Sequence, residues 1–295
     1  MPRVEIPAGW RRQPEAEARQ RGRALEKGEI LYFPVSPLAF APNDLDFLRA
    51  QKQSAAQYHK NIAYRPGEDR VTGYAGTEAD RMRRVLGEFS RAAQRFLKEF
   101  FPYYRFETEY ASFRPLAEES RPLKPHARND LLHVDNFPTR PTGGHRILRF
   151  FVNLHPERDR HWRTGPAFAE LAQRFAVPSG LIERTRGQES RQSWLRRLAR
   201  LGLPVVIRPA YDRFMLGFHH WLKDNAEFQS APGHEEWHFP PLSAWMVYTD
   251  TVSHAVLGGQ YALEQTMLVR RESLLAPESA PATIVEQLLA LPAGR

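Results

Sequence analysis

The pattern of apolar and polar positions predicts one long amphipathic helix in the first half of the chain. Between residues 78 and 100, apolar side chains such as Met82, Phe89 and Phe96 recur at intervals of three and four. This spacing places them on one side of an α-helix, which must then pack against an apolar partner. Together with a shorter helix before it, the pattern predicts a helical cover within residues 43–100.

Strand-like patterns occupy two later blocks, residues 103–156 and 203–270. In both, apolar residues alternate with polar ones or run continuously, with Pro and Gly between the runs. We interpret residues 211–218 as one of these strands, and residues 160–202 as a helical insertion between the blocks. Short strands interrupted once by helices are typical of a jelly roll with helical cover. We therefore expect a mainly β fold with flanking helices, of the α+β kind.

The two ends of the chain carry fewer large apolar side chains. Residues 1–25 place several arginines among Glu and Gln, so we expect a solvated N-terminal arm there. Residues 26–270 are expected to form a single domain. Residues 271–295 then form a tail with a short helix after its prolines.

Composition excludes several classes of chemistry. The 295 residues include no cysteine, which excludes disulfides, thiolate metal sites, iron–sulfur clusters and cysteine nucleophiles. The N-terminus has no apolar signal-peptide core, and no later stretch approaches the roughly 18 apolar residues of a membrane-spanning helix. We expect a soluble, cytoplasmic protein.

The formal net charge of +8 points to an anionic partner. Only six of the 42 basic residues are lysines, so guanidinium groups carry most of the positive charge. Their planar fork suits carboxylates and phosphates. Nucleic acid, an anionic lipid surface and an acidic small molecule all fit. An arginine-rich composition on a solvated surface is the alternative.

One histidine motif, His234-Glu235-Glu236-Trp237-His238, matches the H-E-x-x-H pattern of zinc hydrolases. That chemistry needs a helix of several turns to hold both histidines on one face. Prolines stand closely before and after the motif, and proline cannot continue a helix. We favour a polar loop leading into a strand and keep the zinc hydrolase as an alternative.

A second constellation is His133-Val134-Asp135 with the distant His254. Alone, the triplet arises readily by chance. At a strand end, however, residues i and i+2 point to the same side and can occupy adjacent positions of one metal. His254 follows a predicted strand at 244–249. Together the three residues match the 2-His-1-carboxylate triad of non-haem iron(II) oxygenases.

Such an iron site needs a co-substrate that supplies electrons, usually the dianion 2-oxoglutarate. If residues 146–153 form a strand, Arg149, Phe151 and Asn153 share one side of it. A buried arginine in an apolar strand is costly unless it pairs with an anion. Arg149 is therefore a candidate for the co-substrate, with Asn153 as an amide donor. The alternative is a structural ion pair between Arg149 and an acidic side chain.

Longer blocks around these residues resemble the Kdo (3-deoxy-D-manno-oct-2-ulosonic acid) hydroxylase family. The similar blocks are residues 132–142, 146–156 and 239–266, with shorter ones at 29–34 and 111–115. The resemblance covers most of residues 25–270. It implies a double-stranded β-helix, that is, a cupin-like jelly roll.

The resemblance also implies an Fe(II)- and 2-oxoglutarate-dependent dioxygenase. Such an enzyme hydroxylates C3 of a Kdo residue on lipid A, in the lipopolysaccharide inner core, to give D-glycero-D-talo-oct-2-ulosonic acid. It consumes O2, releases succinate and CO2, and is expected to benefit from ascorbate. Carried over from the family, the iron ligands would be His133, Asp135 and His254. The residues at 2-oxoglutarate would be Arg114, Arg149, Asn153 and Trp162.

The implied substrate is anionic and lies in a membrane leaflet. The basic segment 191–200, with Trp194, Leu195 and Leu198 among its arginines, could rest on the cytoplasmic face of the inner membrane. An ordinary amphipathic helix over the barrel would look the same. We find no nucleic-acid motif and expect no such partner. A non-catalytic jelly-roll module that binds an anionic glycan or nucleic acid is the remaining alternative.

Overall fold

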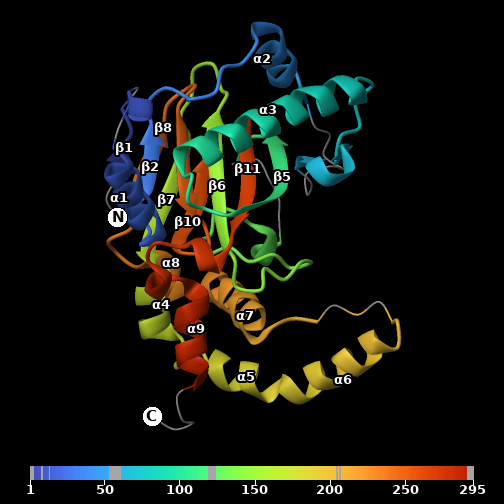
Figure 1. Ribbon diagram of the computed structural model, residues 1–295, viewed down its shortest axis with the longest axis vertical. Helices are drawn as coiled ribbons and strands as arrows, with labels where there is room; N and C mark the ends of the chain where they lie inside the picture. Colours follow the sequence, from blue (N-terminus) through green and yellow to red (C-terminus); the bar gives the residue numbers. More distant parts are fainter. Residues whose placement is uncertain are drawn as a thin grey trace.

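The computed structural model describes residues 3–7, 9–12, 14–52, 61–118, 124–203, 205 and 207–290. Its strands form an eight-stranded sheet, ordered β1-β2-β9-β6-β11-β5-β3-β4, and a three-stranded sheet, ordered β10-β7-β8 (Figure 1). The strands are β1 (Arg3–Glu5), β2 (Ile30–Phe33), β3 (Ile62–Arg65), β4 (Arg70–Thr72), β5 (Phe106–Arg114), β6 (Arg146–Asn153), β7 (Arg160–Ala167), β8 (Glu235–Phe239), β9 (Ala244–Tyr248), β10 (Val252–Gly258) and β11 (Ala262–Val269). All strand pairs except β1–β2 are antiparallel.

Helices cover one face and one end of this sandwich (Figure 1). They are α1 (Glu15–Glu26), α2 (Pro42–Arg49), α3 (Ala79–Phe100), α4 (Phe168–Phe175), α5 (Leu181–Gly187), α6 (Glu189–Arg200), α7 (Ala210–Asp224), α8 (Ala226–Ser230) and α9 (Pro281–Ala290). Helix α3 packs along the larger sheet, whereas α4, α5, α7 and α9 gather below the strands. The expected mainly β fold with flanking helices is confirmed.

Strand β6 is the centre of the larger sheet and is buried along its whole length. Its Leu148, Phe150 and Val152 belong to the core that α3 covers. On its other side, Phe151 packs with Trp162 and Trp245 in the space between the two sheets. The predicted alternation along 146–153 is therefore confirmed. It directs one side of β6 into the sandwich interior, where the candidate site lies.

The helical cover is present, and the apolar stripe predicted at 78–100 lies along α3. Met82, Phe89 and Phe96 are all buried against the sheet. The prediction for 43–100 was incomplete, because β3 and β4 lie between α2 and α3 and extend the larger sheet at its edge.

The N-terminal segment is not a solvated arm, which corrects the prediction for residues 1–25. Strand β1 pairs with β2, and Trp10 packs edge-on against Phe96 and Phe100 at centroid distances of 5.5 and 4.9 Å. The carboxylate of Glu26 accepts backbone N–H bonds from Leu275 and Ala276. A few well-placed contacts therefore dock a segment whose overall composition is polar. Residues 1, 2, 8 and 13 lie outside the described part.

Three further predictions for single segments were wrong. The segment 211–218 is helical, because Tyr211, Phe214, Phe218 and Leu222 recur at helical spacing and are buried on one side of α7. The insertion 160–202 begins with a strand, β7, in which buried and partly exposed residues alternate. The described residues of 203–208 form no strand, so the second block of strands begins at β8. The helix expected in the tail is present as α9.

No helix in the described ranges is both long and apolar enough to cross a membrane.

Candidate metal centre

Backbone hydrogen bonds bring the two distant histidines together. The His133 N–H donates to the His254 carbonyl at 3.1 Å, and the His254 N–H donates to the His133 carbonyl at 2.9 Å. The two imidazole centroids are 4.7 Å apart. The backbone of Asp135 is held by its own N–H, which donates to the Thr249 carbonyl at 2.7 Å. The triplet was expected at a strand end. In the structure, His133 instead forms an isolated β-bridge with His254, which lies within β10.

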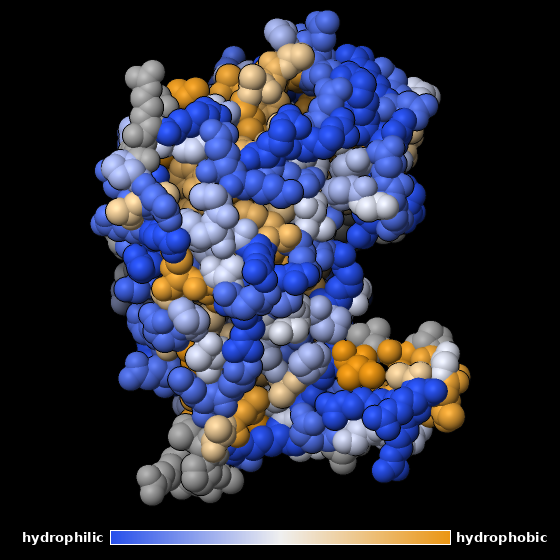
Figure 2. Space-filling view, viewed as in Figure 1, coloured by the Kyte–Doolittle hydropathy of each residue, from blue (hydrophilic) through white to orange (hydrophobic). Residues whose placement is uncertain are grey.

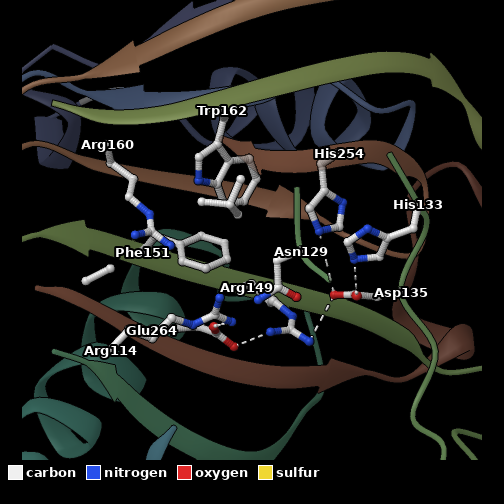
Figure 3. A pocket seen from close by; sticks show the side chains of 12 residues that line it. Arg114, Asn129, His133, Asp135, Arg149, Phe151, Arg160, Trp162, His254 and Glu264 are labelled. Carbon is white, nitrogen blue, oxygen red and sulfur yellow. Dashed lines mark hydrogen bonds and ion pairs between the residues drawn. The ribbon is translucent and has the colours of Figure 1, made fainter. Parts of the chain in front are cut away.

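The side chains present a convergent set of donor atoms. Nδ1 of His133 donates to the Leu131 carbonyl at 2.7 Å, and Nδ1 of His254 donates to the Val252 carbonyl at 2.9 Å. A carbonyl oxygen can only accept a hydrogen bond, so Nδ1 carries the proton in both neutral rings. Nε2 of each ring then has a lone pair that can bind a metal. Nε2 of His133 lies 3.5 Å from one Asp135 oxygen, and Nε2 of His254 lies 4.0 Å from the other. Figure 3 shows the three groups facing one point.

The environment keeps these groups in the protonation states that bind metal. Burial lowers the pKa of the His254 imidazole to about 3 and lowers the pKa of His133 as well. Burial alone would raise the pKa of Asp135. The Arg149 guanidinium and both histidines outweigh it and hold that pKa well below its usual range. Neutral imidazoles beside a carboxylate are therefore present at neutral pH.

A divalent cation fits this arrangement. Two imidazole nitrogens and one carboxylate oxygen within 4.8 Å of one another are the donor set of a facial triad. The carbonyls behind each Nδ1 fix ring orientation and tautomer, as is usual for metal-bound histidine. His133, Asp135 and His254 would hold the cation from one side, and the cavity lies on its other side.

The cavity beside the triad is lined by arginines and aromatic rings. Arg149 lies next to the triad, while Arg114 and Arg160 lie at the far end (Figure 3). Phe151 and Trp162 form the wall between these two ends. The Trp162 ring stacks on His254 at a centroid distance of 5.2 Å and an interplanar angle of 19°.

The charges in this cavity are balanced. Arg149 pairs with Asp135 at 2.9 Å and also with Glu264, whose other oxygen lies 3.2 Å from Arg114. Glu118 pairs with Arg114 at 3.2 Å and with Arg160 at 2.9 Å. Three guanidinium groups therefore face three carboxylates. A divalent cation together with a dianion would preserve this balance, whereas either alone would disturb it.

Of the residues expected at 2-oxoglutarate, the structure places Arg114, Arg149 and Trp162 at the cavity. Asn153 has a structural role instead. Its amide nitrogen donates to the carbonyls of Arg158 and Phe239, both at 2.9 Å, and its oxygen accepts from the His155 N–H. Because its polar atoms hold the loop after β6, we correct the expectation that Asn153 contacts the co-substrate.

Three polar residues of the cavity were missed from the sequence, namely Arg160, Asn129 and Glu264. Arg160 could have been found, because it stands two positions before Trp162 on β7 and so shares its side. Glu264 could have been identified from the charge that two buried arginines require. Asn129 lies in a loop, where no periodic pattern indicates its direction.

The H-E-x-x-H segment does not form a zinc hydrolase site. Residues 235–239 form strand β8, not a helix. His234 precedes the strand and packs edge-on against Phe228. The preferred interpretation as a loop was also wrong, because Trp237 and Phe239 alternate with polar residues and bury one side of the strand. His238 and Glu236 lie on the outer side.

Comparison with known proteins points to one family. The family model for 3-deoxy-D-manno-oct-2-ulosonic acid (Kdo) hydroxylase matches residues 9–292. The apo structure of the Kdo hydroxylase KdoO, a non-heme Fe(II) alphaketoglutarate-dependent dioxygenase, superposes with a TM-score of 0.83 at 30% identity, over 99% of this chain and 97% of that chain. No curated protein sequence matches this chain.

Two other structures of KdoO are also similar. One, in complex with alphaketoglutarate and Fe(III), has a TM-score of 0.82 at 29% identity over 98% of this chain and 96% of its own. Another, in complex with succinate and Fe(III), has a TM-score of 0.81 at 28% identity over the full length of both chains. The family match spans nearly the whole sequence, and the fold and identity agree with it. This chain therefore belongs to the Kdo hydroxylase family.

Proposed function

We propose that this chain is an Fe(II)- and 2-oxoglutarate-dependent dioxygenase that hydroxylates C3 of a Kdo residue. The observation that carries the proposal is the convergence of His133, Asp135 and His254 at one end of a cavity whose other end carries the guanidinium groups of Arg114 and Arg160. The overall reaction consumes O2 and 2-oxoglutarate, inserts one oxygen into a C–H bond, and releases succinate and CO2. Ascorbate would serve as a supporting reductant.

The chain's own residues supply position and charge. The bound iron would supply the redox chemistry that couples decarboxylation to oxygen insertion. His133 and His254 are held by their backbone bonds, and Arg149 orients the Asp135 carboxylate. We infer that these three ligands leave one side free for 2-oxoglutarate and O2.

We further propose that 2-oxoglutarate spans the cavity. Its keto acid end would face the triad, and its far carboxylate would lie between Arg114 and Arg160. Phe151 and Trp162 offer an apolar wall for the two methylene groups between these ends. Both arginines already share Glu118, which would have to yield one partner when the dianion enters. Trp162 would also hold His254 through ring stacking.

The proposed substrate is a Kdo residue on lipid A, at an anionic membrane surface on the cytoplasmic side. Helix α6 projects from the body with α5 (Figure 1), and Figure 2 shows hydrophobic residues on the side of this projection that faces the body. A groove of about 380 Å³ combines Leu195 and Leu216 with Arg184 and Arg208. Trp194 is 56% exposed on the same helix. Apolar and cationic groups together suit an anionic lipid.

An anaerobic titration tests the metal assignment. Iron(II) with 2-oxoglutarate in the proposed geometry should give a weak visible metal-to-ligand charge-transfer band. Asp135→Ala should abolish the band, and His234→Ala should leave it unchanged as a matched histidine control. A band that persists without Asp135 would refute the proposed triad.

Liposome co-sedimentation tests the membrane contact. Binding to anionic vesicles should fall when Arg196, Arg197 and Arg200 are changed together to Ala. The side chain of Arg191, part of the same basic segment in the sequence, lies outside the described residues. Unaltered binding of the triple variant would eliminate α6 as the contact, without touching the assignment of the iron site.

A further inference from the structure

A second group of metal-binding side chains lies on the outer side of the small sheet. His161 on β7 stands directly opposite His238 on β8, and Arg163 stands opposite Glu236. All four point away from the sandwich interior, because the residues between them, Trp162 and Trp237, are buried. The small sheet therefore lies between this group and the candidate iron site.

The distances within this group are short. The two imidazole rings stack with centroids 4.4 Å apart and planes within 15°. Nε2 of His161 lies 3.0 Å from one Glu236 oxygen, while Arg163 donates to the other at 2.9 Å. Each of His161, Glu236 and His238 offers a ligand atom within 4.8 Å of the others. Oδ2 of Asp159 lies 3.9 Å from Nδ1 of His238.

We propose that His161, Glu236 and His238 form a zinc site on the outer side of the small sheet. Two imidazole nitrogens and a carboxylate oxygen form a donor set that zinc accepts in tetrahedral geometry. Water completes the fourth position, because Glu236 and His238 are largely exposed. The groups require little desolvation, so binding does not carry the cost of a buried charge.

The existing electrostatics of the group favour a cation. Glu236 contributes a carboxylate to the group, and Arg163 holds one of its oxygens in place. Arg163 engages only one carboxylate oxygen and leaves the other directed at His161. Asp159 lies next to His238 and adds a second negative charge at the rim.

The site would join an edge strand to the wall of the catalytic cavity. Strand β8 is the outermost strand of the small sheet, and β7 is the middle one. On its other side, β7 carries Arg160 and Trp162, which line the cavity. A zinc ion held by His161 and His238 would tie β8 to β7 and stabilise this wall without contacting the reacting groups. The inference is independent of the proposed function.

Equilibrium dialysis against zinc, with bound metal measured by elemental analysis, tests the proposal. Asp135→Ala removes a carboxylate from the iron site and therefore isolates the outer site. This variant should retain one zinc, and the Asp135→Ala/His238→Ala and Asp135→Ala/His161→Ala variants should lose it. His234→Ala in the same background is the matched control and should keep the zinc. Zinc should also raise the thermal midpoint of Asp135→Ala but not that of the variant lacking His238.

The outcomes are distinct. Absence of zinc from Asp135→Ala, or retention of the same amount after loss of His238, would overturn the outer site. Loss of zinc in the His234→Ala control would shift the assignment to the H-E-x-x-H pair. A wrong assignment of the iron site would give a different result. Asp135→Ala would then remove no metal site, so this variant and wild type would bind equal amounts of zinc.

Discussion

Arg149 and Asp135 form a buried ion pair, with 2.9 Å between the guanidinium Nη2 and the carboxylate Oδ2. The same guanidinium also pairs with Glu264. Burial alone would lower the pKa of Arg149, but the charges of Asp135 and Glu264 outweigh burial and raise it. Arg149 thus links the Asp135 carboxylate of the triad to Glu264, the carboxylate that it shares with Arg114. The structure thus shows the structural ion pair that the sequence left open as an alternative, and a contact between Arg149 and the co-substrate stays a prediction.

Replacing Arg149 with Met should destabilise the protein. The change leaves Asp135 and Glu264 without their shared cation, and breaking a buried pair costs about 3–5 kcal/mol. Urea unfolding of metal-free protein measures this loss. Arg140→Met is the control, because Arg140 is 45% exposed and pairs with Glu109 near the surface. Equal stability of Arg149→Met and wild type would show that the pair contributes nothing.

The metal-free protein should lose stability as the pH falls below the ordinary histidine pKa. Burial lowers the pKa of His133, His219 and His254 in the folded state, so the unfolded chain binds more protons between about pH 6.5 and those lower values. The contribution of His254 to stability is present above pH 6.5 and declines as the pH falls. Asp135 acts in a lower window, below the usual carboxylate pKa, because its own folded pKa is depressed.

Urea unfolding in the presence of a chelator at pH 6.5 and pH 5 checks this dependence. At about 1.4 kcal/mol per pH unit, His254 alone accounts for about 2 kcal/mol across that interval. His254→Gln should remove this share of the loss. The same pH dependence in the variant and wild type would mean that His254 is protonated in the folded protein.

Trp10→Ala should destabilise the protein by about 3–5 kcal/mol, the cost of emptying a buried aromatic site. The ring is 7% exposed and packs against Phe96 and Phe100. Arg11→Ala is the matched control. Arg11 forms a surface ion pair with Glu99 at 2.8 Å and lies over the Trp10 ring at 4.6 Å, and each contact is worth about 1 kcal/mol at most at an exposed site. If residues 1–25 were a solvated arm, neither variant would change the midpoint of thermal or urea unfolding.

Lys223→Met should loosen the loop that leads into the triad. The buried ammonium donates to the carbonyls of His126 at 3.0 Å and Arg128 at 2.7 Å, and burial lowers its pKa to about 8. Without the ammonium, both carbonyls lose a hydrogen-bond donor. A buried carbonyl that lacks its donor costs about 1–3 kcal/mol of folding free energy. Iron affinity, measured by anaerobic titration, should fall together with stability. Lys98→Met on the exposed side of α3 should change neither quantity.

The elements predicted correctly are those whose pattern is long and regular. The stripe from Met82 to Phe96 identified α3, and the alternation through Phe150 and Phe151 gave both sides of β6. His133, Asp135 and His254 were singled out for a strand-end setting, whereas the structure places His133 at an isolated bridge and His254 within β10. The patterns of α3 and β6 depend on local spacing, which a sequence displays directly.

The elements predicted wrongly depend on long-range contacts or on short ambiguous runs. Residues 211–218 are apolar enough for a strand, and only continuation to Leu222 shows helical spacing. The docking of Trp10 depends on a surface that α3 supplies far along the chain. Asn153 shares a side with Arg149, but its amide is taken up by loop carbonyls that no periodic pattern reveals. Sidedness along a strand can be predicted, whereas hydrogen-bond partners across loops cannot.

Mass spectrometry of a Kdo-containing lipid A incubated with the protein, iron(II), 2-oxoglutarate and ascorbate tests the central claim most directly. The account predicts a gain of one oxygen on the Kdo unit, with succinate formed in equal amount, and neither product from Asp135→Ala. An unchanged Kdo mass with the iron- and 2-oxoglutarate-loaded wild-type protein, or the same oxygen gain from Asp135→Ala, would contradict it.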